Sequence, residues 1–228
     1  MSSSTPRDIF LRERLRRRGR WKSLQTSFSE QQQLTIRLRF SSPQETYDCF
    51  NTNVLGLLNA TRAILPHMRA QRSGTIALFG SSGSWSGAPG AGIYCATKWA
   101  VSGLAESLRL EVADLGIGVC VIEPGYFRTG FLNSGARVKT ERRIGDYDAS
   151  AVGNTREMLD AYDAKQPGDL EKGARVVVDC FSRLEEVPLR LVLGSDCRAV
   201  IEGKCKATLE YLDKNKEEID GTDYEVGK

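Results

Sequence analysis

Tyr94 and Lys98 are four residues apart in the segment GIYCATKWA at positions 92–100. Side chains four residues apart share one face of a helix, so this spacing brings a phenol next to an ammonium group if the segment is helical. The ordinary tyrosine pKa of about 10 is too high for easy proton exchange near neutrality, and a nearby cation favours the phenolate and lowers that pKa. The pair therefore predicts a general acid/base for a carbonyl or alcohol oxygen. The alternative is a surface tyrosine and lysine without coupling.

Ser81 follows the apolar run GTIALFG at 74–80 and precedes Tyr94 by thirteen residues. This position lies at the carboxyl end of a buried strand, where open α/β sheets bind their ligands. Its hydroxyl can hydrogen-bond a substrate oxygen and stabilise charge there. Ser82 is an adjacent competitor for this role, and a capping or turn role is the alternative for Ser82, Ser84 and Ser86.

The elements that position these residues follow from the hydrophobic pattern. Ser42 followed by Pro43 predicts the start of a long helix. Asn53 lies inside that helix, where asparagine is an unfavourable residue. Its presence there suggests a functional role, and a side chain that simply faces solvent is the alternative. Buried strands alternate with helices along the rest of the chain, which predicts a doubly wound α/β fold with a parallel sheet. The expected strands are 74–80, GVCVIEPG and PLRLVLG, and the expected helices are 93–114, TREMLDAY, DLEKGARVVVDCFSRL and CRAVIEGKCKATLEYLDKNKEEI.

Several ordered segments resemble those of the short-chain dehydrogenases/reductases over about residues 42–206. They are FNTNVLG with Asn53, GSSGSWSGAPGAGIYCATK, EPGYFRTGF after a buried strand, QPGDLEKGARVVVDCF and PLRLVLGSDC. The resemblance implies that Tyr94 is the general acid/base and that Ser81 binds the substrate oxygen. It also implies that Lys98 hydrogen-bonds the nicotinamide ribose and that Asn53 holds a water that relays protons to Lys98. Tyr94, Lys98 and Asn53 thus also belong to the cofactor site.

Three further residues match cofactor positions of the family. Arg62 in NATRAIL corresponds to a position near the cofactor, although a solvated helical arginine is the alternative. At Phe127 the family usually has a smaller aliphatic residue whose backbone reads the carboxamide, so the larger ring would narrow the site. Thr129 would donate to the carboxamide or to a phosphate.

The family's cofactor site begins with a strand, a glycine-rich turn and a helix. Residues 1–42 contain no such pattern, because Gly19 in RRRGRW has no apolar strand before it. A βαβαβ half needs roughly 60 residues, so we expect a Rossmann-type sheet that lacks its first mononucleotide-binding half. The expected organisation is a basic, partly disordered tail at 1–41 and a catalytic and C-terminal portion at 42–228. Within the tail, QLTIRLRF alternates over 34–40 and predicts an edge strand that covers the open side of the sheet.

Composition narrows the class of function. The net charge is +3, but residues 1–40 carry ten basic against three acidic residues, whereas the rest carries 22 against 26. The positive charge thus belongs to the tail, which argues against a nucleic-acid-binding domain. The single His67 and six scattered cysteines argue against a metal site and a disulfide framework. The sequence contains no apolar run long enough to predict a membrane span. We expect a cytoplasmic protein, and mitochondrial targeting by the Arg/Ser-rich start is a minor alternative.

Two function classes stay open. The first is an NAD(P)-dependent oxidoreductase that reduces a carbonyl or oxidises a secondary alcohol of a small organic molecule in a biosynthetic pathway, with NADP favoured over NAD. The second is a truncated, cofactor-deficient homologue without turnover, acting as an interaction subunit or representing an incomplete gene product. The family resemblance also implies a homodimer or homotetramer.

Overall fold

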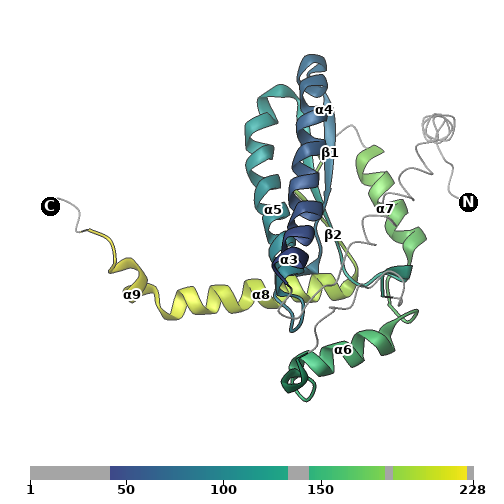
Figure 1. The fold of residues 1–228 in the computed structure, drawn as a ribbon. Helices are drawn as coiled ribbons and strands as arrows, with labels where there is room; N and C mark the ends of the chain where they lie inside the picture. The colour runs from purple at the N-terminus through teal and green to yellow at the C-terminus, as the bar shows by residue number, and fades with distance from the viewer. Residues whose placement is uncertain (1–41, 133–143, 183–186, 225–228) are drawn as a thin grey trace, which may run out of the picture.

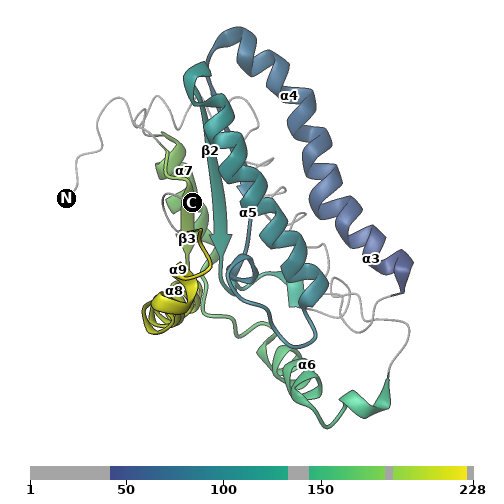
Figure 2. The same cartoon turned by 90° about the vertical axis from the view of Figure 1, so that its left-hand side faces the viewer.

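The computed structural model describes residues 42–132, 144–182 and 187–224. Its strands are β1 (Gly74–Phe79), β2 (Ile117–Pro124) and β3 (Arg190–Leu193), and they form a parallel sheet in the order β1-β2-β3. Figure 2 shows α4 (Leu57–Gln71) and α5 (Gly92–Val112) on one side of this sheet and α7 (Leu170–Ser182) on the other. The predicted doubly wound α/β class is confirmed. The whole tail predicted at 1–41, with its edge strand predicted at 34–40, lies outside the described residues.

The long first helix begins where the sequence predicts. Ser42 is the N-cap of α3 (Pro43–Phe50), and its hydroxyl accepts a hydrogen bond from Glu45 N at 3.2 Å, while the Glu45 carboxylate accepts one from Ser42 N at 2.8 Å. This capping box satisfies two backbone donors that have no helical partner. Helical structure then continues through the π-helical segment η1 (Asn51–Gly56) into α4.

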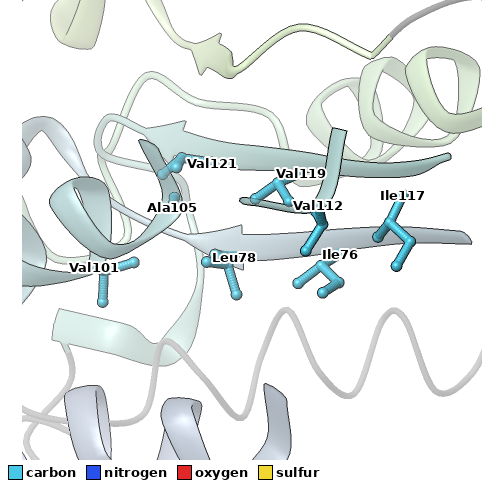
Figure 3. Close-up of a cluster of buried hydrophobic side chains, with 8 residues drawn as sticks. All are labelled: Ile76, Leu78, Val101, Ala105, Val112, Ile117, Val119 and Val121. Atoms are coloured by element: carbon cyan, nitrogen blue, oxygen red, sulfur yellow. The ribbon is translucent and has the colours of Figure 1, made fainter. Parts of the chain in front are cut away.

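The main core fills the space between the sheet and the helices α4 and α5 (Figure 3). It contains the buried aliphatic side chains of Ile76, Leu78, Val101, Ala105, Val112, Ile117, Val119 and Val121. A second, smaller cluster on the other face joins Ile122, Phe127, Val177 and Leu193. The two faces of the central strand β2 are therefore both covered, as its near-continuous apolar sequence requires.

β1 departs from the prediction of a fully buried strand. Ile76 and Leu78 are buried, whereas Thr75 and Ala77, which point to the opposite face, are exposed. Successive side chains of a strand point to opposite faces, and within the described residues the layer α4–α5 covers only one face of β1. β1 is thus an edge strand of the described sheet, with β2 as its one partner there.

The remaining elements lie around this framework. They are η2 (Ser82–Ser84), η3 (Ala113–Leu115), η4 (Gly130–Leu132), η5 (Gly145–Tyr147), α6 (Ala151–Tyr162), α8 (Ser195–Lys214) and α9 (Lys216–Asp220). Figure 1 shows α8 starting beside the sheet and running outward, away from the rest of the fold. Among the described helices, none combines the length and apolar character that a membrane crossing requires.

Candidate active site

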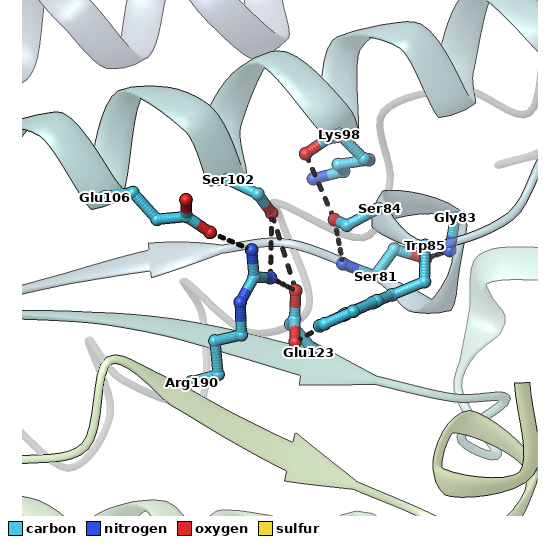
Figure 4. Close-up of polar contacts among 9 residues, drawn as sticks. All are labelled: Ser81, Gly83, Ser84, Trp85, Lys98, Ser102, Glu106, Glu123 and Arg190. Carbon is cyan, nitrogen blue, oxygen red and sulfur yellow. Dashed lines mark hydrogen bonds and ion pairs between the residues drawn. The ribbon is translucent and has the colours of Figure 1, made fainter. Parts of the chain in front are cut away.

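Ser81 lies just after β1, at the carboxyl end of the sheet, as the sequence predicts. It is the N-cap of η2, and its hydroxyl accepts a hydrogen bond from Gly83 N at 3.1 Å. The neighbouring Ser84 is buried, donates from its hydroxyl to the Lys98 carbonyl oxygen at 3.0 Å and accepts from Ser81 N at 3.2 Å (Figure 4). Ser84 therefore fixes the Ser81 turn against α5. This structural role for Ser84 agrees with the capping or turn alternative.

Tyr94 lies in the first turn of α5, and its hydroxyl shares a hydrogen bond with the Ser81 side chain. Desolvation raises the pKa of Tyr94 to about 12, and the hydrogen bond with Ser81 opposes that rise. The expectation that Lys98 lowers this pKa is wrong for this structure, because loss of water around the phenol outweighs the other influences. Tyr94 is consequently a protonated phenol at neutral pH.

Lys98 lies one helical turn further along α5 and is buried, with only 8% of its surface exposed. Its Nζ lies 5.7 Å from the centroid of the Tyr94 ring and donates a hydrogen bond to the Phe79 carbonyl oxygen at 2.8 Å. Burial lowers the pKa of Lys98 to about 8, because an ammonium group loses hydration energy in a poorly hydrated site. The described structure gives this ammonium group one hydrogen-bond acceptor, which leaves two N–H bonds for a ligand.

Asn53 reaches this group through the π-helical segment η1. Its Nδ2 donates to Thr97 Oγ1 at 3.0 Å, and the Thr97 hydroxyl donates to the Tyr94 carbonyl oxygen at 2.7 Å. A π-helical turn within an α-helix is rare and is frequent at functional sites. The unfavourable asparagine thus coincides with a local change of helix type, and its side chain joins η1 to α5 instead of facing solvent.

A cavity of about 300 Å³ lies between the helical segment η1–α4 and β1. Lys98 and Asn53 provide its main polar side chains, and Thr52 and Thr61 add hydroxyl groups. The other lining residues are small or apolar: Gly56, Leu57, Ala60, Ile64, Ile76, Ala77, Leu78 and Phe79. The lysine predicted to bind a ribose therefore borders a largely apolar hollow large enough for part of a ligand.

The other predicted cofactor residues lie apart from this cavity. Phe127 is buried in the second core cluster, and its carbonyl oxygen accepts from Thr129 N at 2.9 Å. The Thr129 hydroxyl accepts from Phe131 N at 3.3 Å. Arg62 lies on the exposed side of α4, where its guanidinium donates to Asn59 Oδ1 at 3.4 Å. The structure thus brings Ser81, Tyr94, Lys98 and Asn53 together but not Arg62.

Sequence reasoning missed a polar cluster in which the buried Ser102 and Glu123 meet the partly buried Trp85 and Arg190 and the exposed Glu106 (Figure 4). Glu123 is fully buried on β2, pairs with Arg190 and accepts a hydrogen bond from Trp85 Nε1 at 2.9 Å. Arg190 on β3 also pairs with Glu106, and its guanidinium stacks 4.5 Å from the centroid of the Trp85 ring. An acidic residue inside the apolar run GVCVIEPG was the available signal, because a buried charge requires a partner.

Sequence and structure comparisons agree with this geometry. Residues 34–138 match the family model described as short chain dehydrogenase. The chain is 34% identical over 167 residues to Oxidoreductase BOA17 of Botryotinia fuckeliana, which is 73% of this chain and 59% of that protein. It is 41% identical over 97 residues to a 3-ketodihydrosphingosine reductase of Bacteroides thetaiotaomicron, covering 42% of this chain and 36% of that enzyme.

Solved structures show the same fold. A short-chain dehydrogenase from Streptomyces avermitilis superposes with a TM-score of 0.72 at 35% identity, covering 81% of this chain and 65% of that one. A short-chain dehydrogenase from Sphingobium yanoikuyae, solved with NADPH, has the same fold with a TM-score of 0.52 at 18% identity, over 85% of this chain and 63% of that one. The chain thus spans less than two thirds of the length of these relatives. With its matching segments and its Ser81–Tyr94–Lys98 arrangement at the carboxyl end of a parallel sheet, the chain belongs to the short-chain dehydrogenase/reductase family.

Proposed function

We propose that this protein is an NAD(P)-dependent oxidoreductase that interconverts a carbonyl and a secondary alcohol of a small organic molecule in a biosynthetic pathway of the cytoplasm. The observation that carries the proposal is the hydrogen bond between the Ser81 and Tyr94 side chains, with Lys98 buried one turn away. A partly buried proton donor beside a second hydroxyl fits an oxygen atom that gains or loses a proton.

Tyr94 has the protonation state that a reduction needs. With a pKa of about 12 it keeps its proton at neutral pH and delivers it to the oxygen of a bound carbonyl. The Ser81 hydroxyl hydrogen-bonds the same oxygen as negative charge develops there. Lys98, with a pKa lowered to about 8, exchanges protons more readily near neutral pH than an ordinary lysine and can restore the tyrosine proton through the water that we assign to Asn53.

The residues present fit the nicotinamide end of the cofactor. Lys98 has two N–H bonds for a ribose, and it borders the cavity together with Asn53. Phe127 and Thr129 do not line this cavity, and their contact with the carboxamide is what the family resemblance implies. When bound, the cofactor supplies or accepts a hydride. Apart from the loop between β1 and α5, which carries Ser81, the described residues offer no glycine-rich turn before a helix N-terminus for the pyrophosphate, so the contacts proposed here serve one end of the molecule. We propose NADP rather than NAD as the cofactor.

Calorimetric titration of the full chain with NADPH and with NADH tests the proposal. We expect micromolar binding of at least one cofactor, lost in Lys98→Ala and kept in Lys172→Ala, a matched control on the exposed face of α7. Tyr94→Phe is expected to keep binding but lose turnover of any carbonyl that the wild-type chain reduces. Absence of binding at millimolar concentrations of both cofactors would refute the oxidoreductase and leave the alternative, a cofactor-deficient homologue that is an interaction subunit or an incomplete gene product.

A further inference from the structure

Lys98 combines burial with access to an apolar cavity. Its side chain lines the cavity of about 300 Å³ between η1–α4 and β1, and so does Phe79, whose carbonyl oxygen accepts the hydrogen bond from Lys98 Nζ at 2.8 Å. Ala60 and Ile64 line the same cavity and are exposed, so the cavity opens to solvent along α4. A small molecule that enters from this side therefore reaches the lysine.

The surroundings of the Lys98 nitrogen favour the neutral amine. Within the described part of the chain, its hydrogen-bond acceptor is the uncharged carbonyl oxygen of Phe79, and no carboxylate pairs with it. The ionisable groups beside it there are the phenol of Tyr94, whose ring centroid lies 5.7 Å from Nζ, and the thiol of the buried Cys49. Desolvation is the largest influence on this group, and it lowers the pKa of Lys98 to about 8.

A neutral amine that borders an apolar cavity is a nucleophile for carbonyl compounds. The nitrogen attacks the carbonyl carbon of an aldehyde, and the resulting carbinolamine loses water to give an imine. Both N–H hydrogens of the amine leave with the carbonyl oxygen as water, so a C=N bond replaces the C=O bond without an oxidant or a reductant. The neutral imine also removes a charge that is costly to bury, and this outweighs the lost hydrogen bond to Phe79.

We propose that Lys98 is a reversible covalent binding site for apolar aldehydes, which it holds as an imine with the hydrocarbon part of the aldehyde in the cavity. The lining of the cavity selects this class of ligand, because apart from Lys98 it contains no charged side chain. An aldehyde with a charged tail would bury that charge without a partner, since Lys98 loses its own charge in the imine. The site goes beyond the proposed oxidoreductase function and does not rest on it, because neither a cofactor nor a hydride enters the reaction.

Reductive trapping on the full chain without cofactor tests the proposal. Octanal with sodium cyanoborohydride at pH 7.5 converts each imine into a stable secondary amine, and peptide mass spectrometry measures the labelling rate of each lysine. At this pH about a quarter of Lys98 side chains are neutral, compared with about one in a thousand for an ordinary exposed lysine. We therefore expect labelling of Lys98 to be at least about tenfold faster than labelling of Lys172, whose side chain is 83% exposed.

A second aldehyde tests the selectivity of the cavity. Suberic semialdehyde has the same chain length as octanal and a terminal carboxylate. It is expected to label Lys98 at least about tenfold more slowly than octanal, because the carboxylate would be buried without a cation. The rates at Lys172 should be similar for the two aldehydes, since the tail stays in solvent there.

Two alanine variants of α4 separate the cavity from the amine. Ala60→Phe places a ring in the cavity, whereas Ala70→Phe places the same ring at an exposed position of α4 that does not line it. Octanal labelling of Lys98 should fall at least about fivefold in Ala60→Phe and stay at the wild-type rate in Ala70→Phe. Formaldehyde is too small to need the cavity, so it should label Lys98 at the wild-type rate in both variants.

The contrary results are equally specific. Octanal labelling of Lys98 that is no faster than labelling of Lys172 would overturn the proposal. Equal labelling of Lys98 by octanal and suberic semialdehyde would overturn it as well, and this comparison uses the wild-type chain alone. A chain that forms the imine but binds neither NADPH nor NADH would retain this site and lose the proposed oxidoreductase function, so the two conclusions are tested separately.

Discussion

At the scale of single residues, burial controls the two ionisable groups of the site more than their mutual charge does. The pKa of Tyr94 rises to about 12 and that of Lys98 falls to about 8, and desolvation is the largest cause in both cases. Each group is therefore held towards its neutral form. A partly buried proton donor and a buried lysine that titrates close to neutrality are suited to proton exchange.

Lys98→Met is expected to stabilise the protein near pH 7. The pKa of Lys98 is about 8 in the native state instead of 10.5. Below pH 8 the buried lysine is charged, which lowers the free energy of unfolding of the wild-type protein, and a methionine at this position has no such charge. The unfolded chain binds more protons than the native one between pH 8 and 10.5, so wild-type stability rises with pH through that window and the advantage of methionine disappears. We expect a gain of about 1–3 kcal/mol at pH 7, after loss of the hydrogen bond to Phe79, and almost none at pH 10.5.

Urea denaturation of wild type and Lys98→Met at pH 7, 8.5 and 9.5 measures this effect. Lys172→Met, whose side chain is 83% exposed, serves as the control and is expected to change stability little at any pH. A Lys98→Met protein that is less stable than wild type at pH 7 would contradict the conclusion that the buried ammonium group lowers the stability of the native state.

At the scale of elements, the polar cluster around the buried Glu123 connects β2, β3, α5 and the loop after β1. Tyr94, Lys98, Ser102 and Glu106 repeat every four residues along α5, so the same helix face carries the proposed catalytic pair at one end and the cluster at the other. Trp85 follows the short helix η2 directly. Its Nε1 donates a hydrogen bond to Glu123 and so connects the Ser81 turn to this cluster. Positioning of the active site and stability of the sheet are thus coupled.

Arg190→Met is expected to destabilise the fold by about 3 kcal/mol at pH 7, because it leaves the fully buried Glu123 carboxylate without its cation. Burial already raises the pKa of Glu123, and loss of Arg190 raises it further. A raised native pKa means that stability falls as pH increases, so the defect should be smaller at pH 5 than at pH 7. Chemical denaturation at both values tests this. Arg198→Met, in an exposed pair with Glu202, should cost under about 0.5 kcal/mol.

Gly116→Ala is expected to cost about 1–2 kcal/mol at the turn between α5 and β2. Gly116 has φ +69°, and a Cβ there would lie 2.6 Å from the Arg72 carbonyl oxygen. Gly103→Ala is the matched control, because Gly103 is exposed in the middle of α5 and a Cβ there would meet no atom within 4 Å. It should stabilise the helix by about 0.5–1 kcal/mol, so thermal melts should move in opposite directions. Equal shifts of the two melts would contradict a specific strain at Gly116.

At the scale of the whole molecule, the main feature is that one edge of β1 has no neighbouring strand among the described residues. Within the described residues β1 pairs with β2 alone, and the cavity beside it is mostly apolar. An exposed strand edge next to apolar surface favours pairing with another strand.

The alternating segment QLTIRLRF predicts how this edge is covered. If residues 34–40 pair with β1, their backbone amides should exchange at least about 100-fold more slowly than in an unfolded peptide. Hydrogen exchange followed by mass spectrometry measures this, and Leu38→Asp should remove the protection. Exchange of these amides at the rate of an unfolded peptide would disprove the predicted edge strand.

Local sequence determined much of this protein, because caps, strand periodicity and spacing along one helix act over a few residues. Ser42 and Pro43 start the first helix, GTIALFG and GVCVIEPG form strands, and the interval from Ser81 to Tyr94 brings their hydroxyls together. Tertiary structure alone decided the pairing of Glu123 with Arg190, the exposed face of β1, the place of Arg62 on the outside of α4 and the direction of the Tyr94 pKa shift. These depend on which distant groups exclude water from a side chain, and local sequence does not specify that burial.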